Sequence, residues 1–312
     1  MDIYFDSGFI QVLNKDIYDL QKLHRRGMRR LMDLFEEYVG ICVYSNLSID
    51  DIISNYPFQK LLNNNGTNDS EETFKIKIKS RYVSAQMLAF FGENSDLSLS
   101  KEIQELGGLC FTSSNYLDEV EKFLSYEKPV YLKYGDNSSF NWNELKDYGF
   151  ETDSILLIDK YLLSSESKAR EHFLPMLKGL LAKSISKRIT IISCYETGGE
   201  NIQVKQLIYR FCDENYIDKD IIEIISFDPK SPFNFHDRYL FSRYVTIDSG
   251  RGFDNLFKRY SQRSDAKLKI RTIFTQETYN DFRQLITTYQ DYIKWHNLSK
   301  NNRYSIPFIS LG

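Results

Sequence analysis

Three short apolar runs decide the fold of the C-terminal half: SILLID at residues 154–159, ITIIS at 189–193 and IIEIIS at 221–226. Each run is too short for a typical helix and has the length of a buried strand. The intervening segments, residues 167–183 and 202–211, carry apolar residues at helical spacing. Since strands that alternate with helices are typical of parallel sheets, we expect three strands of one sheet with two intervening helices, the first of them kinked near its proline.

The N-terminal half shows the same alternation with less regular spacing. A helix is expected through Met87 to Phe91, and the asparagine-rich run at residues 63–72 is expected to be an exposed loop. The expected strands are IYFD at 3–6, GICVYS at 40–45, LCFTSS at 109–114 and PVYLKY at 129–134. A helix is also expected, because apolar residues are spaced approximately as on one helical face: Leu20, Leu23, Met28, Leu31, Leu34 and Phe35. This half is therefore predicted to contain a partly parallel sheet.

The chain is thus expected to belong to the α/β class and to form two α/β domains. Residues 1–133 make up the N-terminal α/β domain, and residues 134–152 are a linker. Residues 153–312 make up the second domain, with a helical extension at its C-terminal end. At 312 residues, with 42% hydrophobic and 15% aromatic residues, the chain can bury two cores of ordinary size.

Composition narrows the classes of function. Forty basic residues against 43 acidic ones give a formal net charge of −3, so any nucleic-acid contact has to be local. No apolar run approaches the roughly 20 residues of a membrane span, and the first residues lack the blocks of a signal peptide, so we expect a cytoplasmic protein. The four cysteines are widely separated, so we expect no metal site, no disulfide framework and no cofactor.

Basic residues alternate with apolar ones in two strand-like segments, FKIKIKSRY at 74–82 and AKLKIRT at 266–272. Because side chains alternate between the two faces of a strand, the basic residues of each segment share one face. Such a face is either the solvent-exposed side of a sheet or a surface that follows the phosphates of a nucleic acid. The candidate nucleic-acid-binding residues are Lys75, Lys77, Lys79, Lys267, Lys269 and Arg271.

The densest group of charges and glycines lies in FHDRYLFSRYVTIDSGRGFD, residues 235–254. His236 and Arg238 are two residues apart and share one side of an extended segment, so the histidine could act as a nucleophile while the arginine holds an anion. Glycines that follow a β-hairpin would let backbone N–H groups approach the same anion. In the alternative interpretation, Asp237 pairs with the arginine and the histidine bonds a backbone carbonyl. The candidate catalytic residue is His236, and the candidate anion-binding residues are Asp237, Arg238, Gly250, Arg251 and Gly252.

The order of apolar strand, FHDRYL, second strand and GRGFDNL over residues 153–260 resembles a phospholipase D-like half-domain of bacterial proteins. It is also similar to the related C-terminal domain of microtubule-interacting-and-transport proteins. The resemblance implies a mixed sheet flanked by helices, with His236 in the place of the histidine that attacks phosphorus and Arg238 in that of the phosphate-holding lysine. The family's aspartate place falls on Arg243, and one such motif is visible where active enzymes bring two together. The resemblance therefore implies anion binding and argues against ordinary catalysis.

The N-terminal half carries a weaker set of acidic candidates. Asp6 follows the first expected strand, Asp50 and Asp51 open an expected helix, and Asp118 lies in FTSSNYLDEVEKF. Together they are faintly similar to PIN-type nucleases, which gather acidic residues from strand ends around magnesium. Helix caps and first-turn acids use the same residue types, so the pattern also has a purely structural interpretation.

Three functions remain open from the sequence. The first is a non-catalytic component of a bacterial defence or mobile-element system that binds an anion or a partner. The defence context follows only from the systems in which bacterial proteins with similar domains commonly occur. The second is a phosphodiesterase or nuclease that acts through His236, completed by a second copy of the chain. The third is a metal-dependent nuclease in the N-terminal half. The expected partners are a nucleic acid or another phosphate-containing ligand, and a partner protein or a second copy.

Overall fold

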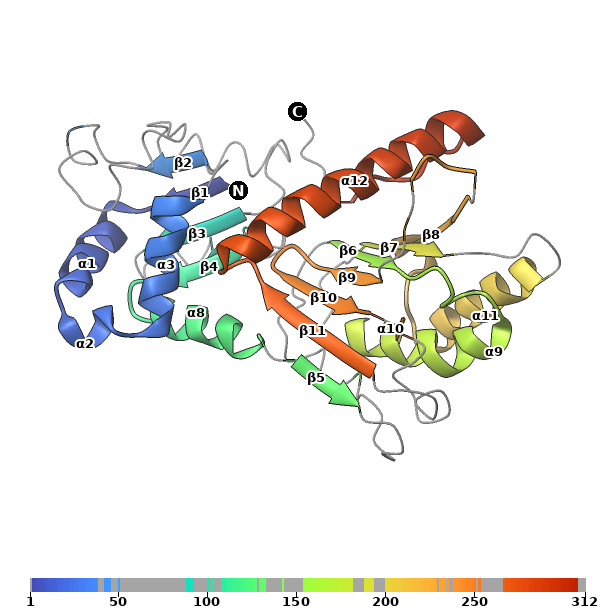
Figure 1. Ribbon diagram of the computed structural model, residues 1–312, viewed down its shortest axis with the longest axis horizontal. Helices are drawn as coiled ribbons and strands as arrows, with labels where there is room; N and C mark the ends of the chain where they lie inside the picture. The colour runs from blue at the N-terminus through green and yellow to red at the C-terminus, as the bar shows by residue number, and fades with distance from the viewer. Residues whose placement is uncertain are drawn as a thin grey trace. The chain divides into compact units, whose positions relative to one another are not determined.

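Two sheets, each in its own unit of the chain, organise the computed structural model (Figure 1). The first unit comprises Met1–Tyr126, Thr272–Ile286 and Phe308–Gly312, and the second comprises Glu127–Arg271 and Thr287–Pro307. The residues that the structure describes are 2–38, 42–45, 50, 88–92, 100–101, 103, 108–127, 129–132, 142, 154–181, 188–193, 200–228, 230–233, 235, 238–250, 252–253 and 266–307. The predicted α/β class is confirmed, because helices accompany a parallel sheet in one unit and a mixed sheet in the other.

The sheet of the first unit is parallel and has the strand order β2-β1-β3-β4. Its strands are β1 (Asp2–Phe5), β2 (Cys42–Ser45), β3 (Leu88–Gly92) and β4 (Leu109–Thr112). The described helices of this unit include α1 (Ser7–Ile17), α2 (Leu20–Leu23), α3 (Arg26–Glu37) and α8 (Tyr116–Ser125). Parallel neighbours need a crossover connection, which the helices α1 to α3 provide between β1 and β2.

Strand β3 shows that the predicted helix through Met87 to Phe91 is wrong. Leu88 to Phe91 pair residue by residue with β1, and Ala89 to Gly92 pair with β4 on the other side. Ala89 and Phe91 are fully buried. A short apolar run fits a buried helical segment as well as a buried strand, and pairing on both sides decides in favour of the strand.

An aromatic cluster fills the core of the first unit. The Phe91 ring on β3 stacks on Phe5 of β1 at a centroid distance of 5.0 Å and on Phe111 of β4 at 4.7 Å. Phe9 of α1 lies 5.1 Å from Phe91, and Phe35 of α3 meets Phe5 edge to face at 5.1 Å. Stacked and edge-to-face pairs at these distances add about 1 kcal/mol each to the free energy of burial. These contacts hold α1 and α3 against the sheet.

Helix α3 has one buried face, as the apolar spacing predicted. Met28, Leu31 and Leu34 are fully buried. Leu20, which we expected on the same face, is instead 68% exposed. It lies in the separate helix α2, which ends before the turn at His24, so the helical register does not continue from α2 into α3.

The second unit contains a mixed seven-stranded sheet with the order β5-β11-β10-β9-β6-β7-β8. Strands β6 (Ser154–Ile158), β7 (Arg188–Ser193) and β8 (Ile222–Ser226) are parallel neighbours. The helical segment after β6 consists of α9 (Glu166–Lys168), the π-helix η2 (Ala169–Phe173) and α10 (Leu174–Leu181). The helical segment after β7 consists of α11 (Glu200–Glu214) and the short 3-10 helix η3 (Lys219–Ile221). The prediction of three strands with two intervening helical segments is therefore confirmed.

The π-helical turn η2 lies directly before Leu174 and Pro175. Proline has no N–H group, and its ring displaces the carbonyl of Glu171, four positions earlier. The helix therefore changes its hydrogen-bond spacing at the position where the sequence predicted a kink.

Strands β9 (Tyr239–Phe241) and β10 (Val245–Ser249) form the predicted antiparallel hairpin. Ser242 closes it, because its Oγ accepts hydrogen bonds from the N–H groups of Tyr244 at 3.2 Å and Val245 at 2.9 Å. The Ser242 N–H also donates to the Val245 carbonyl at 2.9 Å. A serine hydroxyl can take over the role that glycine or proline has in other turns, so the hairpin forms without either residue.

Strands β5 (Pro129–Leu132) and β11 (Ala266–Thr272) pair antiparallel in the same sheet. The expected domain boundary at residue 133 grouped β5 with the N-terminal domain, whereas its ladder belongs to the seven-stranded sheet. An apolar run shows that a segment is a strand and carries no information on which distant strand it pairs with.

Helix α12 (Gln276–Lys300) is amphipathic and contributes residues to both units. Tyr279, Ile286 and Ile293 are fully buried, whereas Lys294 and Leu298 are exposed. Its charged face sets it apart from a membrane-spanning helix. Within the described ranges, no helix combines the length and the apolar composition needed to cross a membrane.

Candidate anion site

The carboxyl ends of the parallel strands β6, β7 and β8 meet at one edge of the seven-stranded sheet. Asp159, Lys160 and Tyr161 follow β6 directly, and Phe227 follows β8. In open α/β sheets ligands bind at this edge, because the loops that leave parallel strands converge there. Side chains of these loops are therefore placed to form a binding site.

Asp159 connects the loop after β6 to the glycine turn after β10. It is fully buried; its Oδ1 accepts a hydrogen bond from the Tyr161 N–H at 2.9 Å and its Oδ2 accepts one from the Phe253 N–H at 2.8 Å. Its own N–H donates to the Ile192 carbonyl at 3.1 Å. A buried carboxylate needs such partners, because burial without them is costly. Asp159 thus positions backbone segments that lie far apart in the sequence.

The glycine turn lies next to Arg238. The Ser249 N–H donates to the Arg238 carbonyl at 2.9 Å, and the Arg238 Nη1 donates to the Gly250 carbonyl at 3.5 Å. Gly252 has a φ of 101°, a backbone conformation that residues with a Cβ rarely adopt. The structure thus brings together Arg238, Gly250 and Gly252 from the predicted set. Arg251 lies outside the described residues.

Three cationic side chains surround the ring of Tyr161, and we call Lys160, Lys168 and Arg238 the cationic cluster. The Nζ atoms of Lys160 and Lys168 lie 5.6 Å and 5.7 Å from the ring centroid, and the Arg238 guanidinium carbon lies 5.9 Å from it. Lys160 also lies 5.2 Å from the Phe227 centroid. Cations at such distances are attracted to the electron-rich faces of aromatic rings.

The cationic cluster can bind an anion. Like charges that share one ring repel each other, and the ring offsets only part of this repulsion because it carries no net charge. An anion placed between the side chains would be attracted by all three of them. Sequence reasoning missed Lys160, Tyr161 and Lys168. The sequence feature that could have identified them is their place after a strand. Lys160 and Tyr161 directly follow the SILLID strand, and loop residues at the carboxyl ends of parallel strands commonly contact ligands.

The remaining predictions for the charged motif are only partly covered by the described residues. His236 and Asp237 lie outside them, so the proposed nucleophile and its neighbour stay predictions. Arg243, in the place of the family's aspartate, lies in the turn between β9 and β10. Asp248 lies on β10, where it pairs in register with Tyr239.

In the basic strand β11, exposed basic residues alternate with buried apolar ones, as predicted. Leu268 and Ile270 are buried, whereas Lys267 and Lys269 are exposed. Tyr131 of β5 pairs in register with Lys267, is 59% exposed and has the lysine Nζ 5.3 Å from its ring centroid. Arg271 is partly exposed, and the other predicted set, Lys75, Lys77 and Lys79, lies outside the described residues. An exposed tyrosine beside lysines offers stacking as well as charge.

Two of the acidic candidates of the first unit, Asp6 and Asp118, have structural roles. Asp6 is the N-cap of α1, where its Oδ1 accepts a hydrogen bond from the Gly8 N–H at 2.7 Å. Asp118 pairs with Arg25 at 2.7 Å. Asp50 is exposed, and Asp51 lies outside the described residues. Among the described residues, no group of three His, Cys, Asp or Glu side chains is arranged to hold a metal ion.

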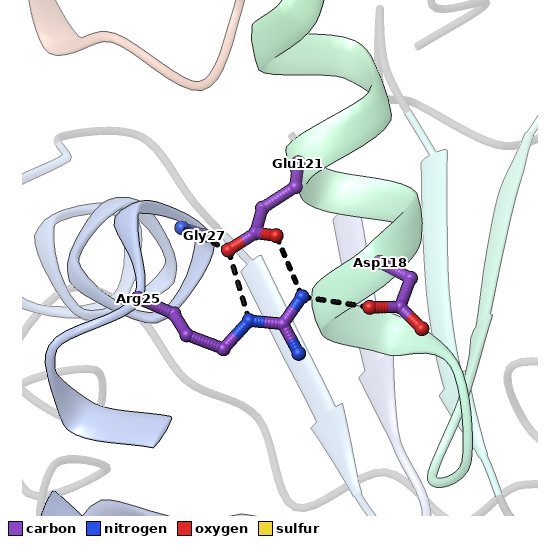
Figure 2. A network of polar contacts seen from close by, with 4 residues as sticks. All are labelled: Arg25, Gly27, Asp118 and Glu121. Atoms are coloured by element: carbon purple, nitrogen blue, oxygen red, sulfur yellow. Dashed lines mark hydrogen bonds and ion pairs between the residues drawn. The ribbon is translucent and has the colours of Figure 1, made fainter. Parts of the chain in front are cut away.

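Arg25 connects α3 to α8 through two carboxylates (Figure 2). Its Nε and Nη2 donate to the two oxygens of Glu121 at 3.0 Å and 2.6 Å, and its Nη2 also donates to Asp118. The Gly27 N–H donates to Glu121 Oε1 at 3.4 Å. The hydrogen bonds from Arg25 lower the pKa of Glu121 below its ordinary value, and Glu121 in turn raises the pKa of Arg25. This network leaves Asp118 engaged in a helix–helix contact.

No protein-family model matches this chain, and a comparison with curated proteins finds no match to its sequence. The phospholipase D-like resemblance therefore rests on the motif residues alone.

Proposed function

We propose that the protein is a cytoplasmic, non-catalytic component of a bacterial defence or mobile-element system that binds a phosphate-containing ligand at the carboxyl edge of the seven-stranded sheet. The observation that carries this proposal is the convergence of Lys160, Lys168 and Arg238 on Tyr161, beside the turn of Gly250 and Gly252. The defence context rests only on the systems in which bacterial proteins with the resembled domains commonly occur.

Phosphate is the anion that this chemistry suits best. A guanidinium can donate two parallel hydrogen bonds to phosphate oxygens, and two flexible lysines add charge from other directions. A glycine turn lets a ligand approach the backbone, since it has no side chain to exclude it. The proposal needs no nucleophile, and it is compatible with an arginine in the place of the family's aspartate.

The test is calorimetric titration of the full chain with pyrophosphate, together with an assay for cleavage of single- and double-stranded DNA. Lys168→Gln and Arg238→Gln should each weaken pyrophosphate binding by about tenfold, because each removes a charge-assisted hydrogen bond. Lys178→Gln is the matched control, since Lys178 is an exposed lysine on α10 outside the cationic cluster. Equal affinities of the Lys168 and Lys178 variants would contradict the proposal. DNA cleavage that disappears in His236→Ala would instead support a phosphodiesterase.

Strand β11 favours nucleic acid as a second phosphate-containing ligand. Lys267 and Lys269 share the exposed face of the strand, and Tyr131 beside them can stack on a base. We therefore expect a fluorescent single-stranded oligonucleotide to bind at low salt and to dissociate as salt rises. Lys267→Ala with Lys269→Ala should reduce the slope of log affinity against log salt by about 1 for each lost phosphate contact. Failure of the wild-type chain to bind at low salt would refute this role.

A further inference from the structure

Helices α1, α2 and α3 of the first unit enclose an open groove of about 840 Å³. The apolar part of its lining includes Tyr18, Leu23 and Met32, and all of its charged lining comes from α3. The groove lies in a different unit from the cationic cluster, so the inference drawn from it is independent of the proposed function.

One large aromatic side chain of the lining, Tyr18, is 81% exposed. Leu20 on α2, which is 68% exposed, lies two positions further along the chain. Single exposed apolar residues are common on protein surfaces, whereas an exposed aromatic side chain over a hollow lined by Leu23 and Met32 is typical of a surface that associates with another protein. Methionine and tyrosine are also side chains that protein interfaces favour.

The charges that line the groove form an ordered stripe along α3. Arg26, Arg29, Asp33 and Glu36 are spaced by three, four and three residues, which places them on one side of the helix. The stripe is positive at its N-terminal end and negative at its C-terminal end. Arg30, the remaining charged residue of the lining, pairs with Asp33 at 3.1 Å.

This stripe is complementary to itself. If a second copy of α3 lies antiparallel to the first, the register that places Arg26 opposite Glu36 of the second copy also places Arg29 opposite Asp33 of the second copy. Two-fold symmetry repeats both pairs in the other direction, as it does in every interface that uses the same surface twice. One register therefore pairs all four charges of the stripe with opposite charges.

We propose that the groove along α3 is the surface through which two copies of this chain associate, with the two α3 helices antiparallel. The apolar lining residues Tyr18, Leu23 and Met32 supply most of the affinity, because exposed ion pairs contribute little. The charges determine the orientation and the register, since no other antiparallel register pairs all four of them with opposite charges. A nucleic acid suits the groove less well, because Asp33 and Glu36 would repel its phosphates.

The test is a charge exchange measured by sedimentation velocity of the full chain at low salt, up to about 100 µM. The wild-type chain should form dimers, and Arg29→Glu or Asp33→Arg alone should weaken dimerisation by at least about tenfold. An equimolar mixture of the two variants should form a heterodimer, because the two reversed charges then face each other and the native pair remains on the other side of the axis. Arg26→Glu mixed with Glu36→Arg tests the same register independently.

The controls are Lys178→Glu and Glu214→Arg, which reverse exposed charges on helices of the second unit. Both should dimerise like the wild-type chain, and circular dichroism should show that every variant is folded. A wild-type chain that stays monomeric, variants of the stripe that dimerise normally, or a mixture that remains monomeric would each overturn the proposal.

Discussion

Arg25 in the first unit and Arg238 in the second are both held by neighbouring side chains, but the neighbours differ in charge. Arg25 donates to Glu121 and Asp118, so two carboxylates surround its positive charge (Figure 2). Arg238 lies with Lys160 and Lys168 around the uncharged ring of Tyr161. The first arrangement neutralises an arginine, and the second gathers positive charge at one place.

This difference separates a structural arginine from a candidate ligand-binding one. An arginine enclosed by carboxylates from another helix stabilises the contact between the two helices, and little of its charge is left for an external ligand. Cations around an aromatic ring are oriented by it, and the ring itself carries no net charge that would neutralise them. The α3 stripe is a third case, in which positive charges at one end of a helix and negative charges at the other are proposed to pair with a second copy of that helix.

The largest effect is expected at Asp159, which positions the cationic cluster without belonging to it. Asp159→Ala should lower the free energy of unfolding by about 3 kcal/mol, because it leaves the N–H groups of Tyr161 and Phe253 without their acceptor. The measurement is urea unfolding followed by circular dichroism. Asp218→Ala is the control, since Asp218 is exposed and its Oδ1 accepts one backbone hydrogen bond from Asp220 at 2.9 Å. The control should lose no more than about 1 kcal/mol.

Asp159→Ala should also weaken pyrophosphate binding, because it releases both the loop that carries Tyr161 and the glycine turn. A variant as stable as the wild-type chain would show that these two hydrogen bonds contribute nothing. A destabilised variant with unchanged affinity would show that contacts other than those of Asp159 position the cationic cluster.

A smaller effect is expected at Arg25. Arg25→Ala should lower the free energy of unfolding by about 1 kcal/mol and leave pyrophosphate affinity unchanged, because the network is partly exposed and therefore screened by solvent. Arg170→Ala is the matched control, since Arg170 and Glu166 form an exposed ion pair at 2.6 Å within one helical segment. The control should change stability by no more than about 0.5 kcal/mol. A loss of pyrophosphate affinity in Arg25→Ala would show that Arg25 is not a purely structural arginine.

The smallest expected effect is the change with pH in the stability difference between the wild-type chain and Arg25→Ala. Arg25 lowers the pKa of Glu121 in the folded state, so the ionised Glu121 contributes stability above the ordinary pKa of glutamate. That contribution is lost as the pH falls through the lowered pKa. The difference in stability between the wild-type chain and Arg25→Ala should therefore shrink in acid, as followed by urea unfolding at a series of pH values. A difference that does not depend on pH would show that Glu121 is not the carboxylate responsible.

Part of the candidate site could be recognised in the sequence. The charged motif drew attention to Arg238 and the glycines, and the structure places Arg238 beside Gly250. The cationic cluster could not be recognised in this way, because Lys168 joins Lys160 only through the packing of α9 near the end of β6. Asp159 reads as an ordinary strand-end residue, and its partner Phe253 lies 94 positions away along the chain.

Local patterns determined the class of fold and most of its elements: apolar runs of strand length became β6, β7 and β8, and helical spacing located the buried face of α3. Only the tertiary structure decided that Leu88–Gly92 is a strand, that β5 pairs with β11, and that Tyr161 gathers three cations. The physical reason is the range of the interactions. Periodicity reports which side of an element is buried, whereas strand partners and charge clusters depend on residues that are brought together only when the chain folds.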